Sequence, residues 1–107
     1  MADVLGTFEQ AVLLAIARLE DGAYGRAILN EVQTRLERDV AAGAVHATLV
    51  RLEEKGLLTS RRALDGGPSR RRFALSPVGA RALAETRAMR DRLWDGVALQ
   101  RLLSLAR

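Results

Sequence analysis

Hydrophobic residues recur at helical spacing in three consecutive stretches of the first half of the chain. The spacing predicts helices from Phe8 to Leu19, from about Tyr24 to Glu37, and from about Ala42 to Lys55. Thr7 and Gln10 have the spacing of a capping box at the start of the first helix. The three stretches therefore read as three short helices joined by tight connections.

The second half of the chain begins with a pattern typical of a β-hairpin. Residues 57–62 and 72–75 read as strands, and glycine and proline between them provide the turn. Ser76 and Pro77 then form a helix start, and a long helical segment follows to about Leu105. Gly96 interrupts this segment, and the pattern leaves open whether it kinks the helix or ends it.

This order of elements predicts a mainly α fold with a small β-hairpin. Three helices followed by a two-stranded ribbon form a winged helix-turn-helix domain, here continued by a long C-terminal dimerisation helix. We expect residues 1–76 to form the DNA-binding part and residues 77–107 the dimerisation helix, within one compact module.

Composition excludes several classes of function. The chain has 107 residues, no cysteine and one histidine, His46, so disulfide scaffolds, cysteine metal sites and a catalytic triad are not expected. We expect no cofactor, no metal and no enzymatic activity. The longest apolar run, residues 11–17, is far below the ~20 residues that a membrane span needs, so we expect a cytoplasmic protein without a membrane partner.

Positive charge is concentrated at the predicted hairpin. The formal net charge of the chain is +4, and residues 61–72 alone hold five arginines against Asp65, which also gives +4. Arginine binds phosphate through a planar, forked set of donors. The hairpin is therefore a candidate contact for the DNA backbone, although a charged hairpin that only protects an exposed strand edge is the alternative.

The third predicted helix has small side chains on its outward face. A helix that enters the major groove must bring its backbone close to the base edges, and small residues allow this approach. We expect the helix to face the groove and the hairpin arginines to bind phosphate or the minor groove. The candidate DNA-binding residues are Gly43, His46, Ala47, Val50, Arg51, Arg61, Arg62, Arg70, Arg71 and Arg72.

Two segments carry more apolar surface than one small domain is expected to cover. Residues 11–17 are apolar on every side of the first helix, and eight of the thirteen residues from Leu93 to Leu105 are apolar. We expect a second copy of the chain to cover both, in a homodimer. The candidate dimerisation residues are Leu5, Phe8, Val12, Met89, Leu93, Trp94, Val97 and Leu102.

A joint pattern over residues 5–83 resembles a known family. In the first two helices the matching positions are Leu5, Gly6, Phe8, Glu9, Val12–Ile16 and Ala23–Gly25. In the third helix and beyond they are Gly43–Val45, Thr48, Leu49, Arg51–Leu57, Gly67, Arg70, Arg71, Phe73, Leu75, Ser76, Pro77, Gly79 and Leu83. Together they are similar to the PadR transcriptional regulators, and the short chain resembles the subgroup with a single C-terminal helix.

The resemblance implies a homodimer that represses transcription from a dyad-symmetric operator, and for several members a response to small flat or phenolic compounds. The chain departs from the family pattern at His46, Ala41, Arg72 and Ala74. Without a serine cap at Ala41 a helix start loses about 0.5–2 kcal/mol and a phosphate donor, so no DNA contact is carried over to that position.

The expected function is a sequence-specific DNA-binding transcriptional repressor that acts as a homodimer on an inverted repeat. The alternative is a winged-helix module that binds protein rather than DNA through its apolar terminal helix. Trp94 is the candidate contact for a flat effector, and packing between helices is the favoured role for the same side chain.

Overall fold

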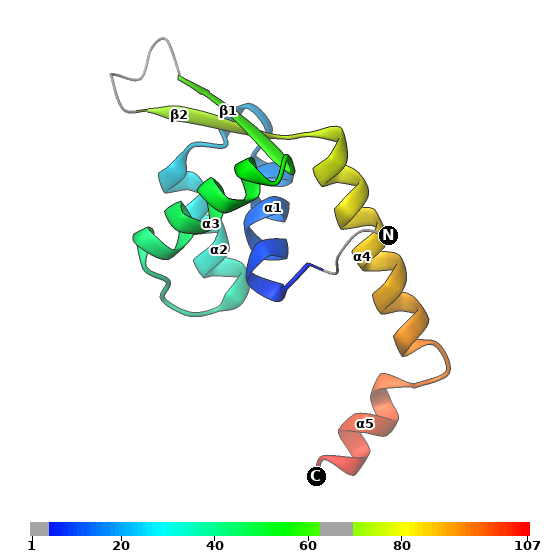
Figure 1. Ribbon diagram of the computed structural model, residues 1–107. Coiled ribbons are helices and arrows are strands. Elements are labelled where there is room, and N and C mark those ends of the chain that lie inside the picture. The colour runs from blue at the N-terminus through cyan, green and yellow to red at the C-terminus, as the bar shows by residue number, and fades with distance from the viewer. Residues whose placement is uncertain (1–4, 63–69) are drawn as a thin grey trace.

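The computed structural model describes residues 5–62 and 70–107 and has the predicted order of helices and strands (Figure 1). The elements are α1 (Thr7–Leu19), the 3₁₀ turn η1 (Glu20–Gly22), α2 (Gly25–Leu36), α3 (Ala42–Glu54), β1 (Leu58–Arg62), β2 (Arg71–Leu75), α4 (Pro77–Trp94) and α5 (Leu99–Leu105). The prediction of a mainly α, winged helix-turn-helix fold is confirmed.

Helix α1 lies at the centre of the domain, in contact with α2, α3, α4 and β2. Its inner residues, including Val12, Leu13 and Ile16, are buried, while Leu14 is 38% exposed. Leu5 and Val12, which the sequence placed at a dimer interface, are 6% and 0% exposed. The chain itself therefore covers these two side chains, and they offer almost no surface to a partner.

The start of α1 differs from the predicted capping box of Thr7 and Gln10. The helix begins one residue earlier, so Gly6 is the N-cap and its N–H donates to Glu9 Oε1 at 3.2 Å. The side chain of Gln10 instead donates to the carbonyl oxygen of Leu5 at 2.9 Å. Glutamate at the third helical position satisfies a backbone N–H that the helix leaves unpaired.

An ion-pair cluster joins α1 to α2. Glu31 Oε1 accepts from Arg18 Nη1 and from Arg35 Nε, each at 3.0 Å. The hydrogen bond from Arg35, together with the positive charge of both arginines, holds the pKa of Glu31 below its ordinary value. All three side chains are at least partly exposed to solvent.

The two strands form an antiparallel hairpin in which Leu58 pairs with Leu75 and Arg62 with Arg71. Leu58 and Phe73 are buried and join the helical core. The other edge of β2 is also held, because Phe73 N–H donates to the carbonyl oxygen of Ala23 at 2.9 Å. This hydrogen bond fixes the hairpin to the segment that directly precedes α2.

The start of α4 packs closely on the segment that connects α3 to β1. Ser76 caps the helix, as the sequence predicted, by accepting from Gly79 N–H at 3.0 Å, and it donates to the carbonyl oxygen of Gly56 at 2.6 Å. Gly79 is buried, and a Cβ atom there would overlap the carbonyl group of Leu57. Glycine is required at this position because two backbone segments touch.

We expect Gly79→Ala to lower the free energy of unfolding by about 1–3 kcal/mol, since the backbone of Leu57 must move to admit the methyl group. Urea unfolding followed by circular dichroism measures the change. Gly43→Ala is the matched control, because a Cβ atom there meets open space within a helix. Equal stability of Gly79→Ala and the wild type would contradict the close approach.

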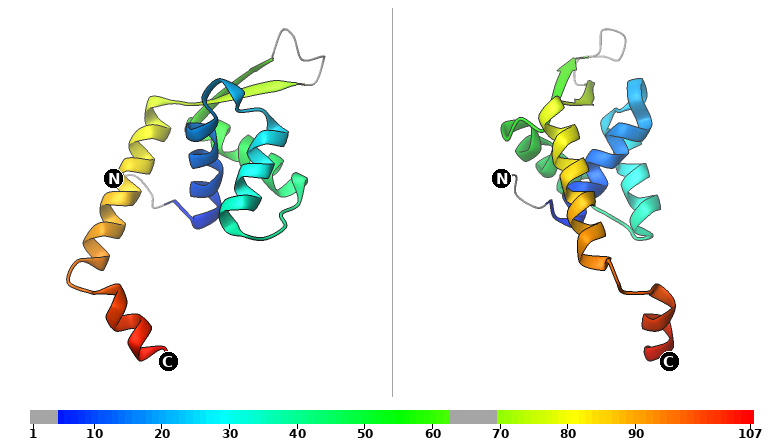
Figure 2. Two further views of the ribbon diagram at one scale, coloured as in Figure 1. Left: turned by 180° about the vertical axis from the view of Figure 1, so that it is seen from behind. Right: turned by 90° about the vertical axis from the view of Figure 1, so that its right-hand side faces the viewer.

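The predicted long terminal helix is in fact two helices. Helix α4 ends at Trp94, Asp95 has extended backbone with ψ 130°, and Gly96 takes a φ of +82° that side-chain-bearing residues rarely adopt. Val97 N–H closes the turn on the carbonyl oxygen of Trp94 at 2.9 Å. Asp95 and Gly96 therefore form a turn that ends α4, and α5 projects from the end of α4, away from the winged-helix core (Figure 2).

Candidate nucleic-acid interface

Helix α3 presents a smooth outer face. Gly43, His46, Ala47, Val50 and Arg51 are all exposed there, as the sequence predicted for the groove-facing side. The opposite face packs on the core through a buried stripe of Val45, Thr48, Leu49 and Leu52. The core thus fixes the helix and leaves its small-residue face accessible.

The hairpin of β1 and β2 is the wing of the winged helix-turn-helix domain. Its strand register separates the arginines that the sequence treated as one group. Paired residues of an antiparallel hairpin point to the same face, and successive residues point to opposite faces. Arg62 and Arg71 are one pair and Arg61 and Arg72 the next, so the two pairs lie on opposite faces. The wing carries positive charge on both faces.

A chain of polar contacts links one face of the wing to α3. Ser60 Oγ donates to the carboxylate of Glu53, with distances of 2.8 and 3.0 Å to its two oxygens. Arg71 Nε in turn donates to Ser60 Oγ at 3.2 Å. Glu53 therefore helps to orient an arginine of the wing.

On the other face of β2, the ring of Tyr24 contacts two arginines. The guanidinium carbon of Arg70 lies 3.7 Å from the ring centroid and that of Arg72 lies 5.6 Å from it. Arg72 Nη2 also donates to Tyr24 Oη at 3.1 Å. Sequence analysis missed this role, because a contact between residues 48 positions apart leaves no periodic signal around Tyr24.

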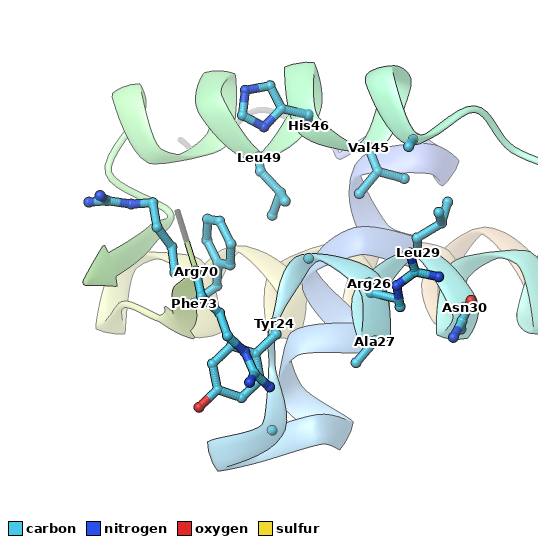
Figure 3. A pocket seen from close by; sticks show the side chains of 14 residues that line it. Tyr24, Arg26, Ala27, Leu29, Asn30, Val45, His46, Leu49, Arg70 and Phe73 are labelled. Atoms are coloured by element: carbon cyan, nitrogen blue, oxygen red, sulfur yellow. The ribbon is translucent and has the colours of Figure 1, made fainter. Parts of the chain in front are cut away.

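These elements enclose a cleft of about 980 Å³ between the start of α2, α3 and β2 (Figure 3). Its apolar lining includes Leu29, Val45, Leu49 and Phe73. Its polar lining comprises Tyr24, Arg26, Asn30, His46, Arg70 and Arg71. None of the described residues that line it is acidic, so the cleft favours an anionic group such as a phosphate.

The apolar side chains predicted for dimerisation gather at the C-terminal end. Leu93 is 74% exposed, and Trp94, Val97 and Leu102 are also exposed. Met89 and Phe8 are half-buried. Trp94, the candidate effector contact, does not line the cleft between α2, α3 and β2. Four of the eight predicted interface residues are thus exposed in the single chain, all of them at the end of α4 or beyond it.

Within residues 5–62 and 70–107, no three or more His, Asp or Glu side chains converge in a way that could hold a metal ion. In the same part of the chain, every helix is too short or too polar to cross a bilayer.

Comparison with solved structures confirms the fold. A PadR family transcriptional regulator from Eggerthella lenta is 30% identical over 86% of this chain and 80% of its own, with a TM-score of 0.65. A PadR-like transcription factor from Bacteroides fragilis is 24% identical over 86% of this chain and 87% of its own, with a TM-score of 0.70. BpsR from Bordetella bronchiseptica, described with the regulation of its DNA binding by 6-hydroxynicotinic acid, is 14% identical over 99% of this chain and 78% of its own, with a TM-score of 0.70.

Sequence comparison gives the family. No curated protein sequence matches the chain significantly. The model of the transcriptional regulator PadR-like family matches residues 13–85, which run from the middle of α1 through α2, α3 and the wing to the middle of α4. The match extends over more than half of the chain, so this chain belongs to the PadR-like family of transcriptional regulators.

Proposed function

We propose that this chain is a cytoplasmic transcriptional repressor that binds an inverted-repeat operator as a homodimer. The observation that carries the proposal is the exposed, small-residue face of α3 beside a wing with arginines on both faces. Helix α3 enters the major groove through Gly43, His46, Ala47 and Val50, with Arg51 nearer the backbone. The wing arginines bind phosphates, which supplies most of the affinity at low salt.

Dimerisation completes the proposed site. The exposed Leu93, Trp94, Val97 and Leu102 form an apolar surface that is costly to leave in water. A second copy covers it, so that two α3 helices face successive turns of one side of the duplex. The half-site centres are then about one helical turn, ~34 Å, apart.

An effector belongs to the proposal as a second step. Since a structural relative, BpsR, is described as regulated in its DNA binding by 6-hydroxynicotinic acid, we propose that a small flat or phenolic compound weakens DNA binding here as well. Trp94 is the candidate stacking surface for this compound, because this residue is 48% exposed in the single chain.

Selection of duplexes from a random pool by the purified protein tests the proposed DNA binding. We expect enrichment of an inverted repeat with half-site centres about 10 base pairs apart. Fluorescence anisotropy then compares the selected duplex with a scrambled one. If no sequence is enriched and random duplex is not bound even at low salt, DNA binding is rejected in favour of a protein-interaction module that uses α5.

A further inference from the structure

Tyr24 is the point at which the wing meets the helix-turn-helix. Its backbone forms an isolated β-bridge with Arg72, beside the hydrogen bond from Phe73 N–H to Ala23. Its side chain contacts Arg72 of β2 and Arg70, which comes directly before the strand. Tyr24 is also the N-cap of α2, so one residue connects the wing arginines to the helix that packs on α3.

The geometry of the ring contact matters for an arginine that binds phosphate. A guanidinium stacked on a ring uses its flat face, and the N–H donors around its edge remain available for hydrogen bonds. Arginine has high rotamer entropy, which is lost when the side chain binds. A stacked arginine has already lost part of this freedom, so it binds phosphate with a smaller entropic cost.

We propose that Tyr24 is a positioning residue for DNA binding, which holds Arg70 of the wing in the orientation that meets the phosphate backbone. The proposal rests on the DNA binding proposed above. The main evidence for this role is the distance of 3.7 Å between the guanidinium carbon of Arg70 and the centroid of the Tyr24 ring. The hydrogen bond from Arg72 to Tyr24 Oη holds the ring beside β2. Arg70 and Tyr24 both line the cleft beside α3, where an anionic group is favoured (Figure 3).

Binding to random duplex DNA at low salt, measured by fluorescence anisotropy, tests this role. We expect Tyr24→Leu, which removes the ring but keeps an apolar side chain, to weaken binding about 3- to 10-fold. Tyr24→Phe keeps the ring face and loses only the hydroxyl, so we expect a smaller loss. Leu36→Ala is the control: it removes a half-buried side chain at the other end of α2 and leaves the affinity of the folded protein unchanged.

A double-mutant cycle separates positioning from a merely structural effect. If Tyr24 acts through Arg70, Tyr24→Leu has little further effect in an Arg70→Ala background. An undiminished loss in that background, or wild-type affinity in the single variant, overturns the proposal.

Arg70→Lys provides an independent test on an exposed residue, should Tyr24→Leu fail to fold. Lysine keeps the charge but lacks the planar group that stacks, so we expect this variant to bind DNA about 3-fold more weakly than the wild type. Binding as tight as that of the wild type would contradict the stacking of Arg70 on Tyr24. Failure of the wild type itself to bind duplex would instead reject the proposed function.

Discussion

Replacing Arg70 and Arg71 by alanine is expected to weaken DNA binding on the order of 100-fold at low salt, for selected and scrambled duplexes alike. Both side chains are exposed at the start of β2 and line the cleft beside α3. Each phosphate contact contributes about −0.9 to the slope of log affinity against log salt. Two contacts in each subunit of a dimer therefore make the slope shallower by about 3 to 4.

A charge-matched control distinguishes local contacts from net charge. Arg81→Ala with Arg90→Ala removes the same charge from exposed positions of α4. We expect this variant to keep most of the salt slope, because charges separated by more than a Debye length, about 10 Å at 0.1 M salt, are screened. Anisotropy titrations at several salt concentrations measure both slopes, and equal slopes in the two variants would contradict the assignment of the wing.

The helices were predictable because each buries one face at a regular spacing. The third helix, expected from about Ala42 to Lys55, runs from Ala42 to Glu54, and its buried side chains, such as Val45 and Leu49, recur at helical spacing. Such contacts are periodic in the sequence, so a single chain reveals them. The smooth outer face of α3 follows from the same spacing.

The arrangement of the wing was less predictable, because it depends on strand register and on distant contacts. Five arginines near the turn indicate positive charge, but only the pairing of Arg62 with Arg71 shows that they divide between two faces. The contact of Tyr24 with Arg72 spans 48 residues and leaves no local pattern. Only the three-dimensional fold brings these two residues together.

Periodicity also does not tell which molecule covers an apolar residue. Val12 satisfies the pattern of a buried position, and the chain itself buries it completely. Leu93 satisfies a similar pattern but is 74% exposed. Gly96 marked a break in the terminal segment, and the extended backbone of Asp95 decides that α4 ends there.

The exposure of Leu93 leads to a second large expected effect. Leu93→Asp should convert a dimer into a monomer, because a carboxylate at a buried subunit contact loses its hydration without gaining a partner. The fold of the subunit should survive, since the side chain is mostly exposed in the single chain. Sedimentation velocity measures the mass, and thermal unfolding checks the fold.

Loss of the dimer should lower affinity for an inverted repeat by at least about 100-fold, because the second half-site then binds as a separate molecule rather than at a high effective concentration. Affinity for an isolated half-site should change little. Val78→Asp is the matched control: it places the same carboxylate on an exposed valine in the first turn of α4, where the helix dipole favours negative charge. A Leu93→Asp protein that remains dimeric would move the subunit contact away from the end of α4, and the spacing of the two α3 helices on DNA would have to be set by another surface.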